Sequence, residues 1–250
     1  MKEGVFLLDE FEKYVAENEL FTHDDKILLT VSGGVDSMVL MSLTAAAGYK
    51  FGVAHCNFQL RGKESDEDEV LVEREAKRLG VEFFNKRFDT TAEMERTGES
   101  MEMAARRLRY EWFNQLCEEQ GYTVIAIAHH IDDSIETFFI NMLRGTGLRG
   151  LTGISNQVGR IIRPLMFATR KEILEYAQRK HINFREDSSN LTTKYLRNKI
   201  RLGLIPRIRE INPRFPFIMH QNIARLTAAQ QFIDGAIDNI YKNIVEYAYS

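Results

Sequence analysis

Short apolar runs alternate with segments of helical periodicity over the first 143 residues. Runs rich in β-branched and aromatic residues predict strands, and apolar positions spaced by about 3.6 residues predict helices. The expected strands are 26–31, 51–56, 81–88 and 122–129. The expected helices are 6–18, 37–47, 65–79, 100–119 and 132–143.

This alternation of strands and helices predicts the fold class. Strands that are separated by helices of about ten or more residues pair in parallel through right-handed crossovers. The run TVIAIA within 122–129 is apolar throughout, which is typical of a sheet covered on both faces. We therefore expect an α/β fold with a doubly wound, parallel, Rossmann-like sheet.

The pattern changes after Arg144. Residues 144–155 are rich in glycine and have no clear period, so we expect a loop there. The periodicity predicts a helix at 170–181, a turn-rich loop at 185–195 and two successive helices within 215–248.

These elements suggest two parts of unequal size. We expect an α/β domain over residues 1–210, and over 211–250 a small helical segment that is a linker or the start of a further C-terminal region.

Composition is that of a globular protein, with 44% hydrophobic and 28% charged residues. The chain contains no run of about 18 apolar residues, so we expect no membrane-spanning segment. The first 20 residues lack the uncharged core of a secretory signal. A cytoplasmic location is therefore expected.

Charge is unevenly distributed around a net value of −3. Residues 64–69 read ESDEDE, whereas 138–171 contain six cations and no acid, and 193–214 contain seven cations and one acid. The basic segments are either solvated faces or local sites for phosphate groups, and the sequence leaves both interpretations open. The two cysteines, Cys56 and Cys117, form no CxxC pair, so we expect reduced thiols rather than a zinc site or a redox pair.

The turn SGGVDS (32–37) stands between an expected strand and an expected helix. Backbone amides at such a turn converge on one point, and the helix N-terminus adds positive potential there. The hydroxyls of Ser32 and Ser37 are candidate hydrogen-bond donors to phosphate oxygens. Asp36 beside a phosphate implies an intervening Mg²⁺. The competing interpretation is a plain strand–helix turn that Ser37 caps.

A second polar segment, AHHIDDSIET (128–137), follows the strand at 122–129. Ligands of open α/β sheets bind beyond the carboxyl ends of strands, so we expect this segment on the same rim as SGGVDS. On a helix, Asp132, Asp133 and Glu136 form one acidic edge. This edge would bind Mg²⁺ or a cationic substrate such as an ammonium group, or it would simply cap the helix.

Together the motifs carry a specific resemblance. SGGVDS matches the SGGxDS pyrophosphate loop (PP loop) of N-type ATP pyrophosphatases, which cleave ATP between the α- and β-phosphates. Six further segments resemble parts of the tRNA(Ile)-lysidine synthetases. They are AHHIDDSIET, AHCNFQLR (54–61), MAARRLRY (103–110), LRGTGLRGL (143–151), RPL (163–165) and the EDSSN…RNKIR block (186–201). The matches run in order along most of the chain.

The resemblance implies a ligase that uses ATP and Mg²⁺ to attach free L-lysine to the wobble cytidine of isoleucine tRNA with a CAU anticodon. Residues 1–210 would then be the catalytic domain, and 211–250 would lead to a tRNA-binding region. The resemblance implies these site residues: for catalysis Asp36, Asp133 and Arg106; for ATP Ser32, Gly33, Gly34, Val35, Asp36, Ser37 and His55; for lysine or tRNA Asp132, Asp133, Glu136, Arg109, Arg144, Arg149, Arg197 and Arg201; and for Mg²⁺ Asp36 and Asp133.

Two departures and two alternatives accompany this resemblance. Phe58 stands where the family commonly has histidine, with Cys56 before Asn57, and the family typically carries further C-terminal domains. A PP-loop tRNA thiolase and a non-catalytic nucleotide-binding module are the alternative functions. Paired sulfur-carrying cysteines would favour the thiolase, and the retained acids Asp36, Asp133 and Glu136 disfavour the inert module. A homodimer stays open.

Overall fold

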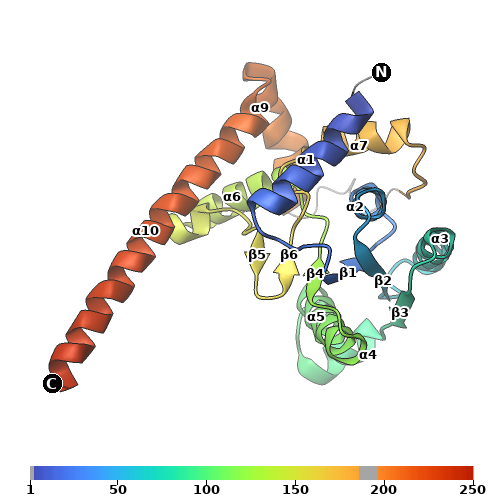
Figure 1. Ribbon diagram of the computed structural model, residues 1–250, viewed down its shortest axis with the longest axis horizontal. Helices are drawn as coiled ribbons and strands as arrows, with labels where there is room; N and C mark the ends of the chain where they lie inside the picture. The colour runs from blue at the N-terminus through green and yellow to red at the C-terminus, as the bar shows by residue number, and fades with distance from the viewer. Residues whose placement is uncertain (1–2, 186–195, 250) are drawn as a thin grey trace. The chain divides into compact units, whose positions relative to one another are not determined.

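The computed structural model of the chain describes residues 3–185 and 196–249 (Figure 1). The described residues group into two compact units. The first unit comprises 3–130 and 156–185, and the second comprises 131–155 and 196–249. This grouping does not coincide with the expected boundary at 210, and that division of the chain stays a prediction.

The first unit is built on a six-stranded sheet of order β3-β2-β1-β4-β6-β5. Its strands are β1 (Lys26–Thr30), β2 (Lys50–Asn57), β3 (Phe83–Arg87), β4 (Val124–Ala126), β5 (Gln157–Val158) and β6 (Ile161–Ile162). All neighbouring pairs are parallel except β5 and β6, which form an antiparallel edge hairpin. The predicted doubly wound sheet is thus confirmed as mostly parallel, with one antiparallel strand that the sequence did not indicate.

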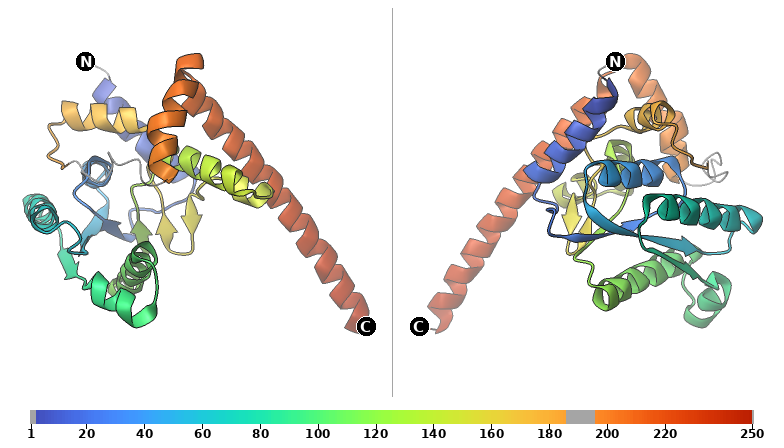
Figure 2. Two further views of the ribbon diagram at one scale, coloured as in Figure 1. Left: turned by 180° about the vertical axis from the view of Figure 1, so that it is seen from behind. Right: turned by 45° about the vertical axis from the view of Figure 1, so that its right-hand side comes forward.

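Helices cover both faces of this sheet (Figure 2). They are α1 (Glu3–Glu17), α2 (Val35–Ala46), α3 (Lys63–Leu79), α4 (Thr90–Thr97), α5 (Met101–Gln120) and α7 (Arg170–Arg179). Side chains alternate along β1: Ile27 and Leu29 join one core with α1, α2, α3 and α7, and Leu28 joins the other with α5. Successive side chains of a strand point to opposite faces of the sheet, and here both faces are covered by helices. Both sets of side chains are therefore buried, which explains why such strands are apolar throughout.

The second unit is helical. It contains α6 (Ile131–Arg144), a 3₁₀ turn η1 (Leu148–Leu151), α8 (Leu196–Lys199), a π-helical turn η3 (Ile200–Leu204), α9 (Ile205–Ile211) and α10 (Phe215–Tyr249). Ile135 and Phe139 of α6 pack with Ile200, Met219 and Ile223 in its core.

Several boundaries differ from those expected. The segment 215–248 lies in one helix of 35 residues, Phe215–Tyr249, rather than in two. Gly235 lies inside it, but one glycine costs a helix only about 1 kcal/mol, and the apolar spacing continues across it. The strand expected at 122–129 is only Val124–Ala126, helix α4 was not predicted, and the loop expected at 144–155 contains η1. Much of the turn-rich loop at 185–195 lies outside the described residues.

None of the described helices has a stretch long and apolar enough to cross a lipid bilayer.

Candidate functional site: the PP loop and the acidic end of α6

The order of the sheet creates a switch point between β1 and β4. From β1 the chain winds outward through β2 and β3, and it then returns to β4 on the opposite side of β1. Ligands of such sheets bind where the winding reverses, beyond the carboxyl ends of the strands. In the first unit this position is taken by SGGVDS after β1 and by His129 and His130 after β4.

The SGGVDS turn is closed by its own hydrogen bonds. The Ser37 hydroxyl accepts from the Ser32 amide at 3.1 Å and donates to the Gly34 carbonyl at 2.9 Å, while Ser32 Oγ accepts from the Gly34 amide at 3.3 Å. Gly33 has φ +92, a left-handed conformation that favours glycine. Because Gly34 caps α2 without a side-chain hydrogen bond, the first amides of that helix are left available for an anion.

Asp36, in the first turn of α2, faces two nitrogen-bearing side chains of the same unit. Arg170 forms an ion pair with Oδ2, and His130 Nε2 lies 3.7 Å from Oδ1. Asp36 Oδ1 is buried and accepts no hydrogen bond.

A buried carboxylate oxygen without a donor suits a hard cation. The residues that the structure describes contain no group of three or more acids, histidines or cysteines that could hold a metal. That is compatible with Mg²⁺, which is usually held by one or two carboxylates together with water and substrate phosphates. Asp36 therefore fits Mg²⁺. Asp133 belongs to the second unit, so the joint metal site of Asp36 and Asp133 stays a prediction.

The acidic run at 64–69 supplies a support for the turn that the sequence did not indicate. Asp68 is 5% exposed and lies beside Gly33. A Cβ added at Gly33 would be 3.4 Å from the Cβ of Asp68. Its carboxylate binds Arg61 at 2.7 Å and Arg185 at 2.9 Å, and the Arg185 amide donates to the Gly33 carbonyl at 3.0 Å. One member of this run is thus buried against the turn. The shared helical face of Asp68, Val72 and Glu75 was the signal that could have revealed it.

His55, expected at the ATP site, is buried on β2 next to the start of the turn. Its Nδ1 lies 2.8 Å from the Val31 carbonyl, which can only accept, so Nδ1 carries the proton and donates. Burial lowers the pKa of His55, although the bond to Val31 opposes the shift. A neutral ring of this tautomer leaves Nε2 as an acceptor for an amino group.

Arg163, of the RPL motif, is a buried cation that was not among the expected site residues. It is 6% exposed, and its Nε donates to His129 Nδ1 at 3.1 Å. Since a guanidinium only donates, the His129 ring accepts at Nδ1. Burial lowers the pKa of Arg163.

The three arginines of α5 have different surroundings. Arg106 is exposed over the Tyr110 ring at 4.9 Å, and Arg109 lies over the Phe58 ring at 5.2 Å. Phe58, at the position of the family's histidine, therefore stacks with a guanidinium.

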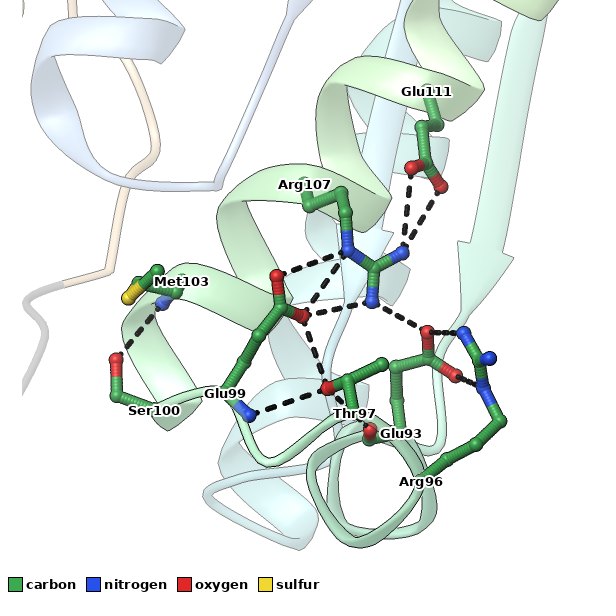
Figure 3. A network of polar contacts seen from close by, with 8 residues as sticks. All are labelled: Glu93, Arg96, Thr97, Glu99, Ser100, Met103, Arg107 and Glu111. Atoms are coloured by element: carbon green, nitrogen blue, oxygen red, sulfur yellow. Dashed lines mark hydrogen bonds and ion pairs between the residues drawn. The ribbon is translucent and has the colours of Figure 1, made fainter.

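Arg107 ties α5 to the preceding helix instead (Figure 3). Its guanidinium donates to Glu99 at 2.9 Å and to Glu111 at 3.3 Å, and it also binds Glu93 of α4. Arg96 binds the same Glu93 at 2.7 Å. This network fixes α4 against the helix that carries Arg106 and Arg109.

In the second unit the acidic end of α6 is matched by arginines. Arg201 binds Glu136 through two bonds of 2.6 and 2.9 Å and lies 3.4 Å from Asp133. Arg209 binds Asp132, and Arg197 lies 3.7 Å from Glu136. Glu136 is 1% exposed, and burial raises its pKa in spite of the bond from Arg201.

Arg201 belongs to the π-helical turn η3, a rare geometry that often marks functional sites. The expected substrate residues Asp132, Asp133, Glu136, Arg197 and Arg201 therefore lie together in this unit. Arg144 is exposed at the last residue of α6, and Arg149 pairs with Asp234 at 2.7 Å on the surface. Whether any of these residues touches substrate stays a prediction.

Comparisons with known proteins agree with this geometry. A model of the PP-loop domain family matches residues 7–208. The chain is 47% identical over 233 residues to a tRNA(Ile)-lysidine synthase of Bacteroides thetaiotaomicron, an alignment that covers 93% of the chain and 55% of that protein. It is 41% identical to a tRNA(Ile)-lysidine synthase of Chlorobaculum tepidum, with 93% of the chain and 73% of that protein covered.

A solved structure of a U34-tRNA thiolase from Methanococcus maripaludis superposes with a TM-score of 0.71 at 16% identity, covering 87% of the chain and 78% of the thiolase. At that identity the likeness concerns the fold. The chain spans about half the length of several curated relatives that it matches. With a family model over most of its length and relatives of this identity, the chain belongs to the PP-loop family and, within it, to the tRNA(Ile)-lysidine synthases.

Proposed function

We propose that this chain carries the catalytic machinery for making lysidine in isoleucine tRNA with a CAU anticodon. The C2 carbonyl oxygen of the wobble cytidine attacks the α-phosphate of ATP, so that adenylate is transferred to the base and pyrophosphate leaves. The ε-amine of free lysine then attacks C2 and displaces AMP. The observation that carries the proposal is the SGGVDS turn at the switch point, in a chain of this family.

The turn would hold the phosphates of ATP. The first amides of α2 point to one spot, and the left-handed Gly33 lets the backbone approach an anion closely. Mg²⁺, held by Asp36, would supply neutralisation of charge on the departing pyrophosphate. His55 Nε2 is the candidate acceptor for the adenine amino group.

Lysine is proposed to bind at the acidic end of α6. A free amino acid presents ammonium and carboxylate groups at once, and the cluster there contains acids and arginines in close proximity. Asp133 and Glu136 would receive ammonium groups. Arg197, which is half-exposed, would meet the carboxylate.

The tRNA is proposed to be held by arginines that stack or protrude. Arg106 and Arg109 of α5 lie over the rings of Tyr110 and Phe58, and bases of single-stranded loops are commonly recognised by such planes. Arg144 and Arg149 would contact phosphates. Three further points stay predictions: that residues 211–250 are a linker towards a tRNA-binding region, that the chain forms a homodimer, and that it is cytoplasmic.

The test uses the 250-residue chain with ATP, Mg²⁺, isoleucine tRNA with a CAU anticodon and labelled lysine. We expect label in the tRNA, with AMP and pyrophosphate formed only when the tRNA is present. The variant Asp36→Asn should fold normally by circular dichroism and form almost no AMP. If sulfide supplied in a parallel reaction enters the tRNA and lysine does not, the thiolase alternative is correct and this proposal is wrong.

A further inference from the structure

The carboxylate of Asp36 is held by a cation whose role the motifs did not indicate. Arg170 is the first residue of α7, whose start is fixed by a capping box between Thr169 and Glu172. Two contacts fix α7 against α2: Tyr176 is fully buried in the shared core, and it is hydrogen-bonded to Ser42. A rigid helix start therefore places Arg170 on Asp36 Oδ2.

This ion pair occupies the carboxylate that would bind the divalent cation. Asp36 and Arg170 side chains are 25% and 44% exposed, so the pair is partly screened by water and can exchange. A guanidinium and a divalent cation on the same carboxylate repel each other, so binding of one weakens binding of the other. Once it leaves the carboxylate, Arg170 remains beside the amides that face the phosphates, and a guanidinium binds phosphate oxygens well.

We propose that Arg170 is a positioning residue that holds the Asp36 carboxylate while no nucleotide is bound, yields it to the divalent cation that accompanies ATP, and then binds the pyrophosphate oxygens. The inference rests on the proposed function only in taking SGGVDS as the phosphate site. It does not depend on lysine or on tRNA.

The first experiment measures binding of Mn²⁺ alone to the ATP-free chain by electron paramagnetic resonance. Arg170→Ala should bind Mn²⁺ about three- to tenfold more tightly than the unmodified chain, because a competing positive charge is lost. The matched control is Lys171→Ala, which removes the neighbouring charge; that side chain is 78% exposed and pairs with Glu175, so affinity should stay unchanged.

Asp36→Asn identifies the site in that experiment. It should abolish the Mn²⁺ binding both alone and combined with Arg170→Ala. Equal Mn²⁺ affinity in Arg170→Ala and the unmodified chain would overturn the proposal, as would Mn²⁺ binding that Asp36→Asn does not change. A thermal melt of each variant verifies folding, which we expect to be intact because Arg170 is half-exposed.

The second experiment measures binding of inorganic pyrophosphate with Mg²⁺ by calorimetry. Arg170→Ala should weaken it about tenfold through loss of a charge-assisted bond, and Lys171→Ala should leave it unchanged. An unchanged affinity in Arg170→Ala would show that Arg170 does not bind pyrophosphate. Both measurements succeed or fail without tRNA, so their outcome is separate from that of the lysine-incorporation test.

Discussion

Arg201 grips Glu136 with two parallel hydrogen bonds of 2.6 and 2.9 Å, and Glu136 is 1% exposed. The pairing compensates a buried carboxylate whose other cationic neighbour, Arg197, lies farther away at 3.7 Å. Its two-point geometry depends on the planar guanidinium, which a lysine side chain cannot reproduce.

We therefore predict that Arg201→Met destabilises the chain by about 2 kcal/mol, because buried Glu136 loses both of its short hydrogen bonds and keeps only the more distant Arg197. Arg201→Lys should recover part of this loss. Urea unfolding of the two variants measures it. A matched control is Arg149→Met, which removes a surface pair with Asp234 and should cost much less. Equal losses of unfolding free energy in Arg201→Met and Arg149→Met would show that Arg201 does not compensate the buried carboxylate of Glu136.

Gly33 provides a second test, since its φ of +92 is unfavourable for any side chain. Gly33→Ala should cost about 1–2 kcal/mol of stability. It should also weaken ATP binding, as the turn shifts and moves the amides that it presents. Calorimetry with ATP measures the second effect.

The neighbouring glycine is the control for strain. Gly34 has φ −74, and the nearest atom to an added Cβ would be Ser32 Oγ at 3.5 Å. Gly34→Ala should therefore leave thermal stability close to that of the unmodified chain. If both alanine variants melt at the same temperature, the left-handed conformation of Gly33 is not what the turn requires.

Sequence periodicity anticipated most of the elements that position the site. The strand–turn–helix around SGGVDS was predictable because apolar strands and glycine-rich turns are local signals, and Asp36 could be singled out by its position among the backbone amides of the turn. The antiparallel strand β5 was not, because two-residue strands carry almost no pattern.

The partners of the site residues were beyond the sequence for a different reason. Arg170 meets Asp36 across 134 positions, and Arg185 meets Asp68 across 117. Such pairings follow from the tertiary packing of α7 and α3, which no local pattern specifies. The acidic run at 64–69 also concealed the one acid, Asp68, that is buried beside Gly33.

The α4–α5 network predicts a response to acid. Hydrogen bonds from Arg96 and Arg107 lower the pKa of Glu93 from 4.5 to about 2. A carboxylate whose pKa is lowered by folding stabilises the folded state at pH values above its pKa in the unfolded chain. This stabilisation is lost as the pH falls towards the pKa in the folded chain. Stability should therefore decline between pH 4.5 and about 2, and Glu93→Gln should remove part of that decline.

Hydrogen exchange in α4 locates this effect. At neutral pH the amides of Thr90–Thr97 should exchange faster in Glu93→Gln than in the unmodified chain. Glu95→Gln is the control, because this acid takes no part in the network drawn in Figure 3. Equal exchange rates in the two variants would mean that the network does not hold α4 in place.

The cysteines separate lysine transfer from sulfur transfer. Burial raises the pKa of the Cys56 thiol to about 12, opposed by the Arg109 guanidinium, and burial also raises the pKa of Cys117. A thiolate is the nucleophile in sulfur chemistry, so neither thiol is prepared for it at neutral pH.

We predict negligible alkylation of the native chain by iodoacetamide at about pH 8, with labelling that increases only at much higher pH. Mass spectrometry of the intact chain measures this, and the chain unfolded in guanidinium should take up two labels. Cys56→Ala should retain most of the lysine-incorporating activity, since the side chain packs against the core that contains Phe88 and Trp112 and has no role in the proposed lysine transfer. Rapid labelling of the native chain, together with loss of turnover in Cys56→Ala, would favour the thiolase alternative.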